Sequence, residues 1–261
     1  RVINLSLIVS SHDYLIMSAT FKIVFGLGAP QVKILVPWSG EPQIFESLSK
    51  LKCHCDSIGI CLEVIIFSGY GNIAVHRLIY NMVNISEVPC VKFDGDMGFI
   101  DLNYFFEVIS CMPNDIVKIF KVRCNIVKKN IHGIHFFGSG VSALTTSNDL
   151  FPDQYSGQCK VVVSDSGKVF ISHCVNPTKE QVCNFVGHRL RKIVRSNFKR
   201  FDYLPLFLRA AFWHPYKVLT GLSSILVMVF SSDYKKANRI GMDKKQKDLH
   251  SFLTSRDLLK E

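Results

Sequence analysis

The sequence predicts an α/β fold in which a mainly parallel sheet carries helices on both of its faces. Short apolar runs alternate with amphipathic stretches through residues 2–111, which is typical of strands joined by crossover helices. Polar or glycine-containing turns separate these runs. Two carboxylates follow the fourth apolar run, and ligands of such sheets bind at the carboxyl ends of the strands. We therefore expect a ligand site at that edge.

The elements of the first half follow from the apolar periodicity. Strands are predicted where apolar residues run together, and helices where they recur every three or four residues. Gly26 and Gly28 are expected to end the first helix, and Pro37 the second strand. The predicted strands cover residues 2–10, 31–36, 61–68 and 89–93, and the predicted helices cover residues 15–26, 42–51, 71–83 and 102–111.

The second half departs from this alternation. Two strands are predicted over residues 115–128 and 131–137, and residues 160–164 and 168–173 are expected to form a hairpin that turns at Asp165-Ser166-Gly167. A helix then begins near Thr178, because Thr178 and Gln181 have the spacing of a capping box and a proline precedes them. Its predicted apolar face is Val182, Phe185, Val186, Leu190, Ile193, Val194 and Phe198.

Charge divides the chain into two parts. Residues 1–175 carry 14 Lys and Arg and 14 Asp and Glu, whereas residues 176–261 carry 17 and 7, so the second part holds the whole net charge of +10. We therefore expect a neutral body over residues 1–175 and a basic tail of amphipathic helices over residues 176–261. Such a tail suits an anionic surface, which is either nucleic acid or phospholipid.

The apolar content of the tail favours phospholipid. Residues 218–232 contain no charge, and this run of fifteen is shorter than the ~20 residues that span a bilayer. Trp213, Tyr216 and Tyr234 flank it, as interfacial aromatic residues do, and six Lys and Arg follow between residues 235 and 247. A nucleic-acid arm would not need the apolar runs, so no nucleic-acid partner is expected. The alternative is a helix packed on the body with a solvated, charged end.

The nine cysteines follow no disulfide framework. An odd count in a chain of 261 residues indicates reduced thiols, as in the cytosol. Cys53, His54, Cys55 and Cys61 lack the usual ligand spacing of a zinc site, so we expect these thiols to be incidental or buried.

The most informative motif is Asp94-Gly95-Asp96, which follows the predicted strand over residues 89–93. Two carboxylates at a strand end can converge on a divalent cation, and the glycine would let a diphosphate approach the backbone. Magnesium and manganese are commonly held by one or two carboxylates together with substrate phosphates. The motif alone is weak, because Asp-x-Asp also occurs in ordinary surface turns.

Together these motifs resemble family 2 glycosyltransferases, which have the Rossmann-like GT-A fold, and in particular bacterial transferases of surface-polysaccharide or lipopolysaccharide assembly. The resemblance covers about residues 2–195. Its motifs are the polar turn at residues 10–14, Gly71 to Arg77 with Asn81, Asp94-Gly95-Asp96, and a later block that comprises residues 171–178, Gln181, Phe185, Gly187-His188-Arg189 and Lys192. One departure concerns Pro37-Trp38-Ser39-Gly40, where the family usually has acidic residues that contact the nucleotide base.

The resemblance implies a metal-dependent, inverting transfer of a sugar from a nucleotide-diphosphate donor, with a UDP-sugar expected, to a glycan or lipid-linked acceptor. The expected metal, Mn²⁺ or Mg²⁺, would be held by Asp94, Asp96 and His173. The donor would contact Ser10, Ser11, Asp13, Arg77, Asp94 and Gly95. An inverting transfer also needs a general base, for which Asp149 and Asp153 are the candidates, with Asp153 preferred.

Two other function classes remain open from the sequence. A nucleotidyltransferase would also use paired carboxylates, but no Gly-rich basic loop follows the first predicted strand. A non-catalytic module that binds membranes or nucleic acid through its basic tail is the other alternative. For the glycosyltransferase, reduced thiols and a basic apolar tail predict peripheral attachment to the cytoplasmic face of the inner (plasma) membrane.

Overall fold

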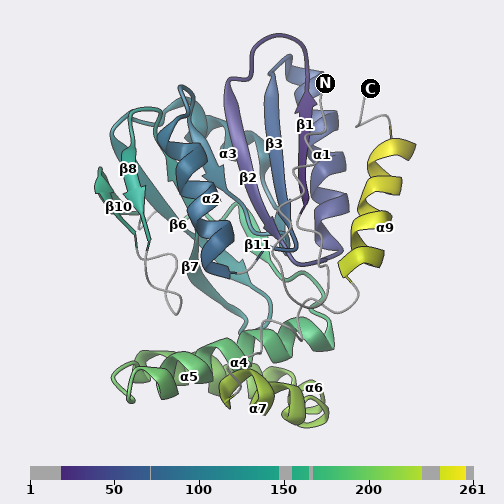
Figure 1. The fold of residues 1–261 in the computed structure, drawn as a ribbon, viewed down its shortest axis with the longest axis vertical. Helices are drawn as coiled ribbons and strands as arrows, with labels where there is room; N and C mark the ends of the chain where they lie inside the picture. The colour runs from purple at the N-terminus through teal and green to yellow at the C-terminus, as the bar shows by residue number, and fades with distance from the viewer. Residues whose placement is uncertain (1–18, 71, 147–154, 165–166, 231–241, 257–261) are drawn as a thin grey trace, which may run out of the picture.

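The computed structural model describes residues 19–70, 72–146, 155–164, 167–230 and 242–256 (Figure 1). Its centre is a nine-stranded mixed sheet with the order β1-β3-β2-β4-β7-β6-β11-β5, and β10 pairs with β6 beside this row. The strands of this sheet are β1 (Ala19–Phe25), β2 (Val32–Trp38), β3 (Leu62–Ser68), β4 (Cys90–Lys92), β5 (Met97–Phe99), β6 (Ile116–Cys124), β7 (Lys129–Phe137), β10 (Lys160–Val163) and β11 (Ile171–His173). Two further strands, β8 (Ser142–Thr145) and β9 (Ser156–Gln158), pair with each other.

The α/β class is confirmed, but the sheet is mixed and not mainly parallel. The pairs β2–β3, β2–β4, β6–β10 and β6–β11 are parallel. The pairs β1–β3, β4–β7, β6–β7 and β5–β11 are antiparallel. Because β7 is antiparallel to both β4 and β6, these two strands point the same way, and their carboxyl ends lie at the same edge of the sheet.

The predicted first helix, residues 15–26, is wrong where the structure describes it. Residues Ala19–Phe25 form the edge strand β1, which is antiparallel to β3. Ala19, Phe21, Ile23 and Phe25 are buried and alternate with less buried residues, which is the period of a strand. Gly26 then turns the chain with a φ of 80°, and a Cβ there would lie 2.4 Å from the Ile60 carbonyl oxygen. The predicted strand over residues 2–10 lies outside the described residues.

The predicted hairpin over residues 160–173 is also wrong. The strands β10 and β11 do not pair with each other, because each pairs in parallel with a different part of β6. The strand β10 lies beside Ile116–Ile119, whereas β11 lies beside Arg123 and Cys124. The end of β11 therefore lies beside the end of β6, with His173 next to Cys124.

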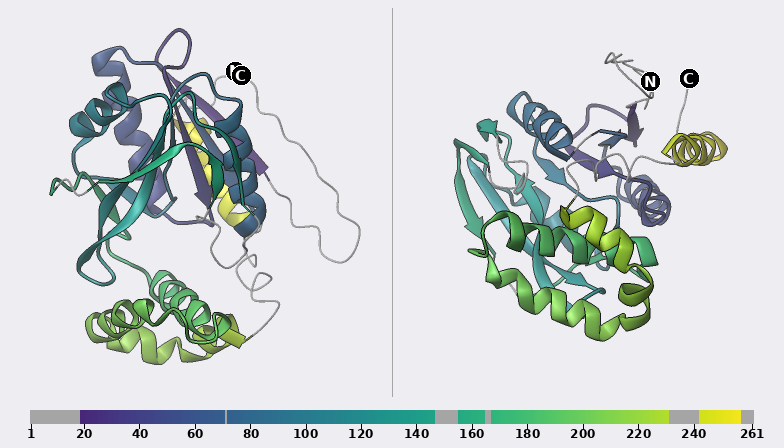
Figure 2. Two further views of the ribbon diagram at one scale, coloured as in Figure 1. Left: turned by 90° about the vertical axis from the view of Figure 1, so that its left-hand side faces the viewer. Right: turned by 60° about the horizontal axis from the view of Figure 1, so that its bottom comes forward.

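Helices cover both faces of the sheet (Figures 1 and 2). On one face, α1 (Gln43–Ile58), α3 (Leu102–Ser110) and α9 (Met242–Ser255) pack on the main hydrophobic core through Leu48, Phe105 and Leu249. On the other face, α2 (Asn72–Asn84) packs through Ile79 and Tyr80. The helix α9 therefore belongs to the body, although it lies in the predicted tail.

A second group of helices forms a layer below the sheet, at the bottom of Figure 1. It consists of α4 (Lys179–Arg195), α5 (Leu204–Trp213), α6 (Pro215–Thr220) and α7 (Leu222–Phe230), with the short helix η1 (Phe201–Tyr203) before α5. The capping box of α4 is present: the Gln181 backbone N–H donates to Thr178 Oγ1, and the Thr178 N–H donates to Gln181 Oε1. The apolar face of α4 is buried as expected through Val182, Phe185, Val186 and Ile193, but Phe198 lies beyond the helix and is exposed.

Candidate metal site at the carboxyl ends of the strands

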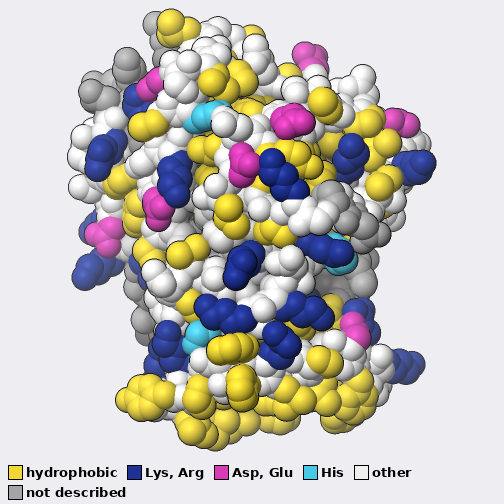
Figure 3. Space-filling model, turned by 180° about the vertical axis from the view of Figure 1, so that it is seen from behind, with side chains coloured by type: hydrophobic (Ala, Val, Ile, Leu, Met, Phe, Trp, Pro, Cys, Tyr) yellow, Lys and Arg dark blue, Asp and Glu magenta, His cyan; other side chains and the backbone are white. Residues whose placement is uncertain are grey.

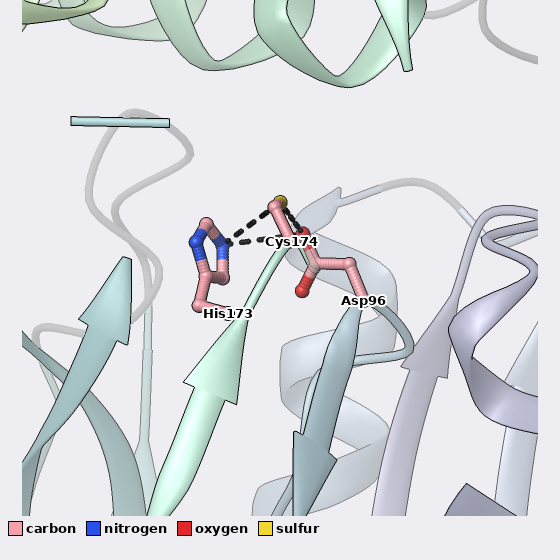
Figure 4. Close-up of side chains that lie close together, drawn as sticks. All are labelled: Asp96, His173 and Cys174. Atoms are coloured by element: carbon pink, nitrogen blue, oxygen red, sulfur yellow. Dashed lines mark hydrogen bonds and ion pairs between the residues drawn. The ribbon is translucent and has the colours of Figure 1, made fainter. Parts of the chain in front are cut away.

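Three side chains that can bind a metal ion converge where β4 and β11 end (Figure 4). Asp96 follows β4, His173 is the last residue of β11, and Cys174 follows it. Asp96 Oδ2 lies 3.1 Å from His173 Nε2 and accepts a hydrogen bond from Cys174 Sγ at 3.0 Å. Cys174 Sγ lies 3.7 Å from His173 Nε2. This Asp96–His173–Cys174 cluster confirms that Asp96 and His173, two of the three predicted metal ligands, lie together.

The short strand β5 brings the cluster together. It pairs antiparallel with β11, and Met97 is opposite His173. The Cys174 backbone N–H extends this ladder by donating to the Asp96 carbonyl oxygen at 2.8 Å. On the other side, the Asn125 N–H donates to the His173 carbonyl oxygen at 3.0 Å. Asp96 and Cys174 are 78 residues apart in the sequence, yet the backbone hydrogen bond between them holds them next to each other.

Cys174 is a member of the cluster that sequence reasoning missed. Adjacent residues of a regular strand point to opposite faces, which would separate the His173 and Cys174 side chains. The strand ends at His173, however, and Cys174 has a φ of 53°, in the left-handed region. This change of backbone conformation turns the thiol toward the same carboxylate oxygen as the imidazole.

A second thiol, that of Cys124, contacts the other ring nitrogen of His173. His173 Nδ1 lies 3.2 Å from Sγ of Cys124, a fully buried residue at the end of β6. Both ring nitrogens are therefore engaged, which fixes the orientation of the ring. Metal-binding histidines are commonly oriented in this way through the nitrogen that does not bind the metal.

The electrostatics of the cluster favour an ion pair. Burial opposes the ionisation of Asp96, but the charge and hydrogen bonds of His173 and the hydrogen bond from Cys174 outweigh it and lower the Asp96 pKa to about 2. Burial likewise opposes protonation of His173, but Asp96, Cys124 and Cys174 raise the His173 pKa well above its usual value. Asp96 is thus an anion and His173 a cation at neutral pH.

One oxygen of the cluster lacks a partner. Asp96 Oδ1 is buried and has no hydrogen-bond partner among the described residues. A buried carboxylate oxygen without a partner is costly, and a bound cation would remove that cost. The residues therefore fit a divalent metal ion, which would replace the proton on His173 Nε2 and bind Asp96.

Asp94, the third predicted ligand, does not belong to the cluster. Its Oδ1 accepts a hydrogen bond at 2.9 Å from Lys92, whose side chain is only 4% exposed, whereas the Asp94 side chain is 34% exposed. Asp94 therefore lies at the rim of the site beside a buried cation.

Gly95 packs against β2. A Cβ at this position would lie 2.6 Å from Trp38 Cδ1 and 2.9 Å from Glu41 Oε2. The glycine is thus required by the close packing of the loop on Trp38 and Glu41, which sequence reasoning did not foresee. Glu41 is a further acid near the site: burial and the charge of Asp96 raise its pKa to about 7.

The remaining predicted residues stand elsewhere or are not described. Arg77 is exposed on α2, and its Nε donates to the Thr146 carbonyl oxygen at 3.3 Å. Thr146 directly precedes residues 147–154, the segment that contains the candidate base Asp149. Ser10, Ser11 and Asp13, and the candidate bases Asp149 and Asp153, lie outside the described residues.

The helix α4 adds an arginine on the side of the cluster. The Arg189 guanidinium lies over the Phe185 ring, 3.4 Å from its centroid, and the same ring lies 6.2 Å from the His173 ring. Arg189 Nε is buried without a hydrogen-bond partner among the described residues. Burial lowers the Arg189 pKa, whereas Cys124, Tyr203, Cys174 and Asp96 raise it. An arginine keeps its charge in proteins, so Arg189 is a cation, and it lies within electrostatic range of Asp96.

His188, next to Arg189, gives a pH prediction. Burial and the charges of Arg189, Lys192 and Arg191 lower its pKa from 6.5 to about 4. Between these two pH values the unfolded chain binds a proton that the folded protein does not, so the free energy of unfolding should fall as the pH falls. We expect His188→Gln to reduce this loss, as measured by urea unfolding at several pH values between 7 and 4. His132→Gln, at an exposed histidine, is the control. Equal pH dependence in wild type and His188→Gln would contradict the prediction.

Comparisons of this chain with protein-family models, with curated proteins and with solved structures found no match. The resemblance to family 2 glycosyltransferases therefore remains a prediction, and the site must be interpreted from its own chemistry.

Proposed function

We propose that the protein is a metal-dependent glycosyltransferase. It would transfer a sugar from a nucleotide-diphosphate donor, with a UDP-sugar expected, to a glycan or lipid-linked acceptor in cell-surface polysaccharide synthesis. The observation that carries this proposal is the Asp96–His173–Cys174 cluster at the carboxyl ends of β4, β6 and β11. One buried carboxylate oxygen of the cluster has no hydrogen-bond partner in the described part of the chain. Ligands of α/β sheets bind at this edge.

The proposed metal is Mn²⁺ or Mg²⁺, held by Asp96 and His173. When bound, it would neutralise the charge that develops on the departing diphosphate. Cys174 donates its thiol hydrogen to Asp96, so we assign it to positioning the carboxylate and not to binding the metal. Asp94, at the rim, would contact the donor and not the metal.

Arg189 supplies a second positive charge for the diphosphate. It lies on α4 beside Phe185, and its Nε, which has no partner within the described ranges, can donate a hydrogen bond to a phosphate oxygen. A leaving group with two phosphates carries more negative charge than one divalent cation neutralises, so a nearby guanidinium would add to its stabilisation.

The general base is assigned to Asp153, with Asp149 as the alternative. Asp153→Asn should bind the donor as well as the wild type but lose transfer by at least ~100-fold, the usual scale for the loss of a general base. Asp149→Asn is the matched variant on the same loop. Comparison of donor binding with transfer rate separates the two roles. If only Asp149→Asn lost transfer, Asp149 would be the base, and if neither did, the assignment of the acceptor site to this loop would be wrong.

A panel of nucleotide sugars tests the proposed function. The wild-type protein should release UDP from at least one UDP-sugar in the presence of Mn²⁺ or Mg²⁺, and a chelator should stop the release. Incubation with nucleoside triphosphates under the same conditions tests the nucleotidyltransferase alternative by release of pyrophosphate. Absence of metal-dependent UDP release from every donor would contradict the proposal.

A further inference from the structure

The lower helical layer exposes an unusual amount of apolar surface. Nine large apolar side chains are exposed along α5, α6 and α7. Six of them form what we call the docking face: Leu208, Phe212, Tyr216, Leu219, Leu226 and Phe230. Four of them, Phe212, Tyr216, Leu219 and Phe230, are between 66% and 76% exposed. Figure 3 shows apolar side chains gathered along this end of the molecule. Apolar patches of this kind mark interaction surfaces.

The helices of this layer have two apolar sides. The inner side packs beneath α4 through Ala210, Ile225 and Val229, which are buried. On α7, Leu226 and Phe230 each follow a buried residue, Ile225 and Val229, so they lie about 100° around the helix from the buried side and remain exposed. A helix that is apolar all round would normally be buried, so the outer side is suited to a second apolar environment.

Basic side chains lie beside the docking face. Residues 176–230 contain nine Lys and Arg but only two Asp and Glu, and one of these acids, Asp202, is paired with Arg200. Figure 3 shows a band of Lys and Arg directly above the apolar end. Arg195 and Lys199 are exposed near the end of α4. Arg209, on α5, donates a hydrogen bond to the Val127 carbonyl oxygen, which holds the neighbouring Lys128 close to α5.

We infer that the docking face inserts into the interface of an anionic phospholipid membrane, with the basic band on the headgroups. An apolar side that carries Phe and Leu below a Lys- and Arg-rich band is the pattern of helices that lie in the plane of a membrane. The three helices are six to ten residues long, and within the described ranges no helix has the length and apolar content to cross a bilayer. The protein would thus lie on one leaflet.

This inference gives α5–α7 and the basic band a part in the attachment that the sequence predicted. Of the six basic residues expected to meet the headgroups, Lys245 lies on α9 beside Ser39 and Gly40, on the body. Three others lie outside the described residues: Lys235, Lys236 and Arg239. The inference does not depend on the proposed catalytic function, because it rests only on exposure and charge.

Flotation with lipid vesicles tests the inference. Wild-type protein should float with vesicles of phosphatidylcholine and phosphatidylglycerol, and much less with phosphatidylcholine alone. The combined variant Phe212→Ser, Leu219→Ser, Phe230→Ser should reduce the bound fraction by at least ~10-fold, because it removes apolar contacts with the membrane. The matched control is Leu27→Ser, Ile85→Ser, Ile100→Ser, which replaces three exposed apolar residues of the body and should float like the wild type.

A charge variant separates the two parts of the interaction. Lys199→Glu should weaken flotation mainly at low salt, whereas Lys160→Glu, at an exposed position on β10, should not. Circular dichroism confirms that each variant is folded. Failure of the wild type to float with anionic vesicles, or equal flotation of the docking-face variant, would overturn the inference. So would sedimentation that shows a lipid-free dimer which the docking-face variant makes monomeric, because the face would then bind a second copy of the chain.

Discussion

Asp96→Asn is expected to abolish the metal-dependent binding of UDP. The substitution removes the negative charge but keeps the shape of the side chain, so the hydrogen bonds around Cys174 and His173 can be retained in part. An amide is a weaker ligand for a divalent cation than a carboxylate, and it no longer offsets the charge of the metal. Isothermal titration with UDP in the presence and absence of Mn²⁺ measures the effect.

Asp94→Asn is the matched control for this experiment. Asp94 lies outside the Asp96–His173–Cys174 cluster and pairs with Lys92, so its loss should weaken the binding of UDP but leave that binding dependent on the metal. Undiminished metal-dependent binding by Asp96→Asn would remove Asp96 from the metal site. Equal and complete loss in both variants would instead support the original prediction that both aspartates bind the metal.

Arg189→Ala is expected to reduce sugar transfer by about 10²–10³-fold, or roughly 3–4 kcal/mol of transition-state stabilisation, which is typical for the loss of one donor that faces developing charge. The effect should appear in kcat more than in the donor KM, because charge on the diphosphate grows as the bond to the sugar breaks. Steady-state kinetics with the best donor of the panel give both constants.

The control for Arg189 is Arg195→Ala, on the same helix but exposed near its end. This variant should retain the kinetics of the wild type, because it lies away from Phe185 and His173. If both variants lost the same activity, the loss would reflect a change in the helical layer or in net charge. If Arg189→Ala retained full kcat, the guanidinium would have no role at the diphosphate.

Much of the body could be predicted because apolar pattern and caps are local signals. The strands β2, β3 and β4 and the helices α1, α2 and α3 lie within a few residues of their predicted positions, with α1 extending seven residues further than expected. The capping box at Thr178 and Gln181 also fixes the start of α4. These features depend on neighbouring residues, which the sequence displays directly.

Pairing partners were harder to predict, because they depend on contacts between distant segments. The alternation in Ala19–Phe25 is typical of a strand, but the glycines after it also suit the end of a helix. The two segments within residues 160–173 have the spacing of a hairpin. Each of them pairs with β6, however, and not with the other segment. Both errors made the predicted sheet more regular than the observed one.

Two residues of the candidate site, Asp96 and His173, were named from the sequence. Asp96 belongs to a motif that follows a predicted strand, and ligands of α/β sheets bind at that edge. His173 was named from the resemblance to glycosyltransferases. Cys174 and Cys124 could not be predicted, since the first depends on a left-handed backbone conformation and the second on the pairing of β6 with β11. Arg189 stood in the later block of the family resemblance, but no role at the site was assigned to it from the sequence.

The most direct test of the central claim is the anomalous scattering of Mn²⁺ in crystals of the wild-type protein grown with Mn²⁺ and UDP. The claim is that Asp96 and His173 hold the cation that a nucleotide diphosphate requires. It predicts an anomalous peak within bonding distance of an Asp96 oxygen and of His173 Nε2, with the phosphates of UDP on its open side. A peak bound by Asp94 without Asp96 and His173, or UDP bound with no metal beside this cluster, would contradict it.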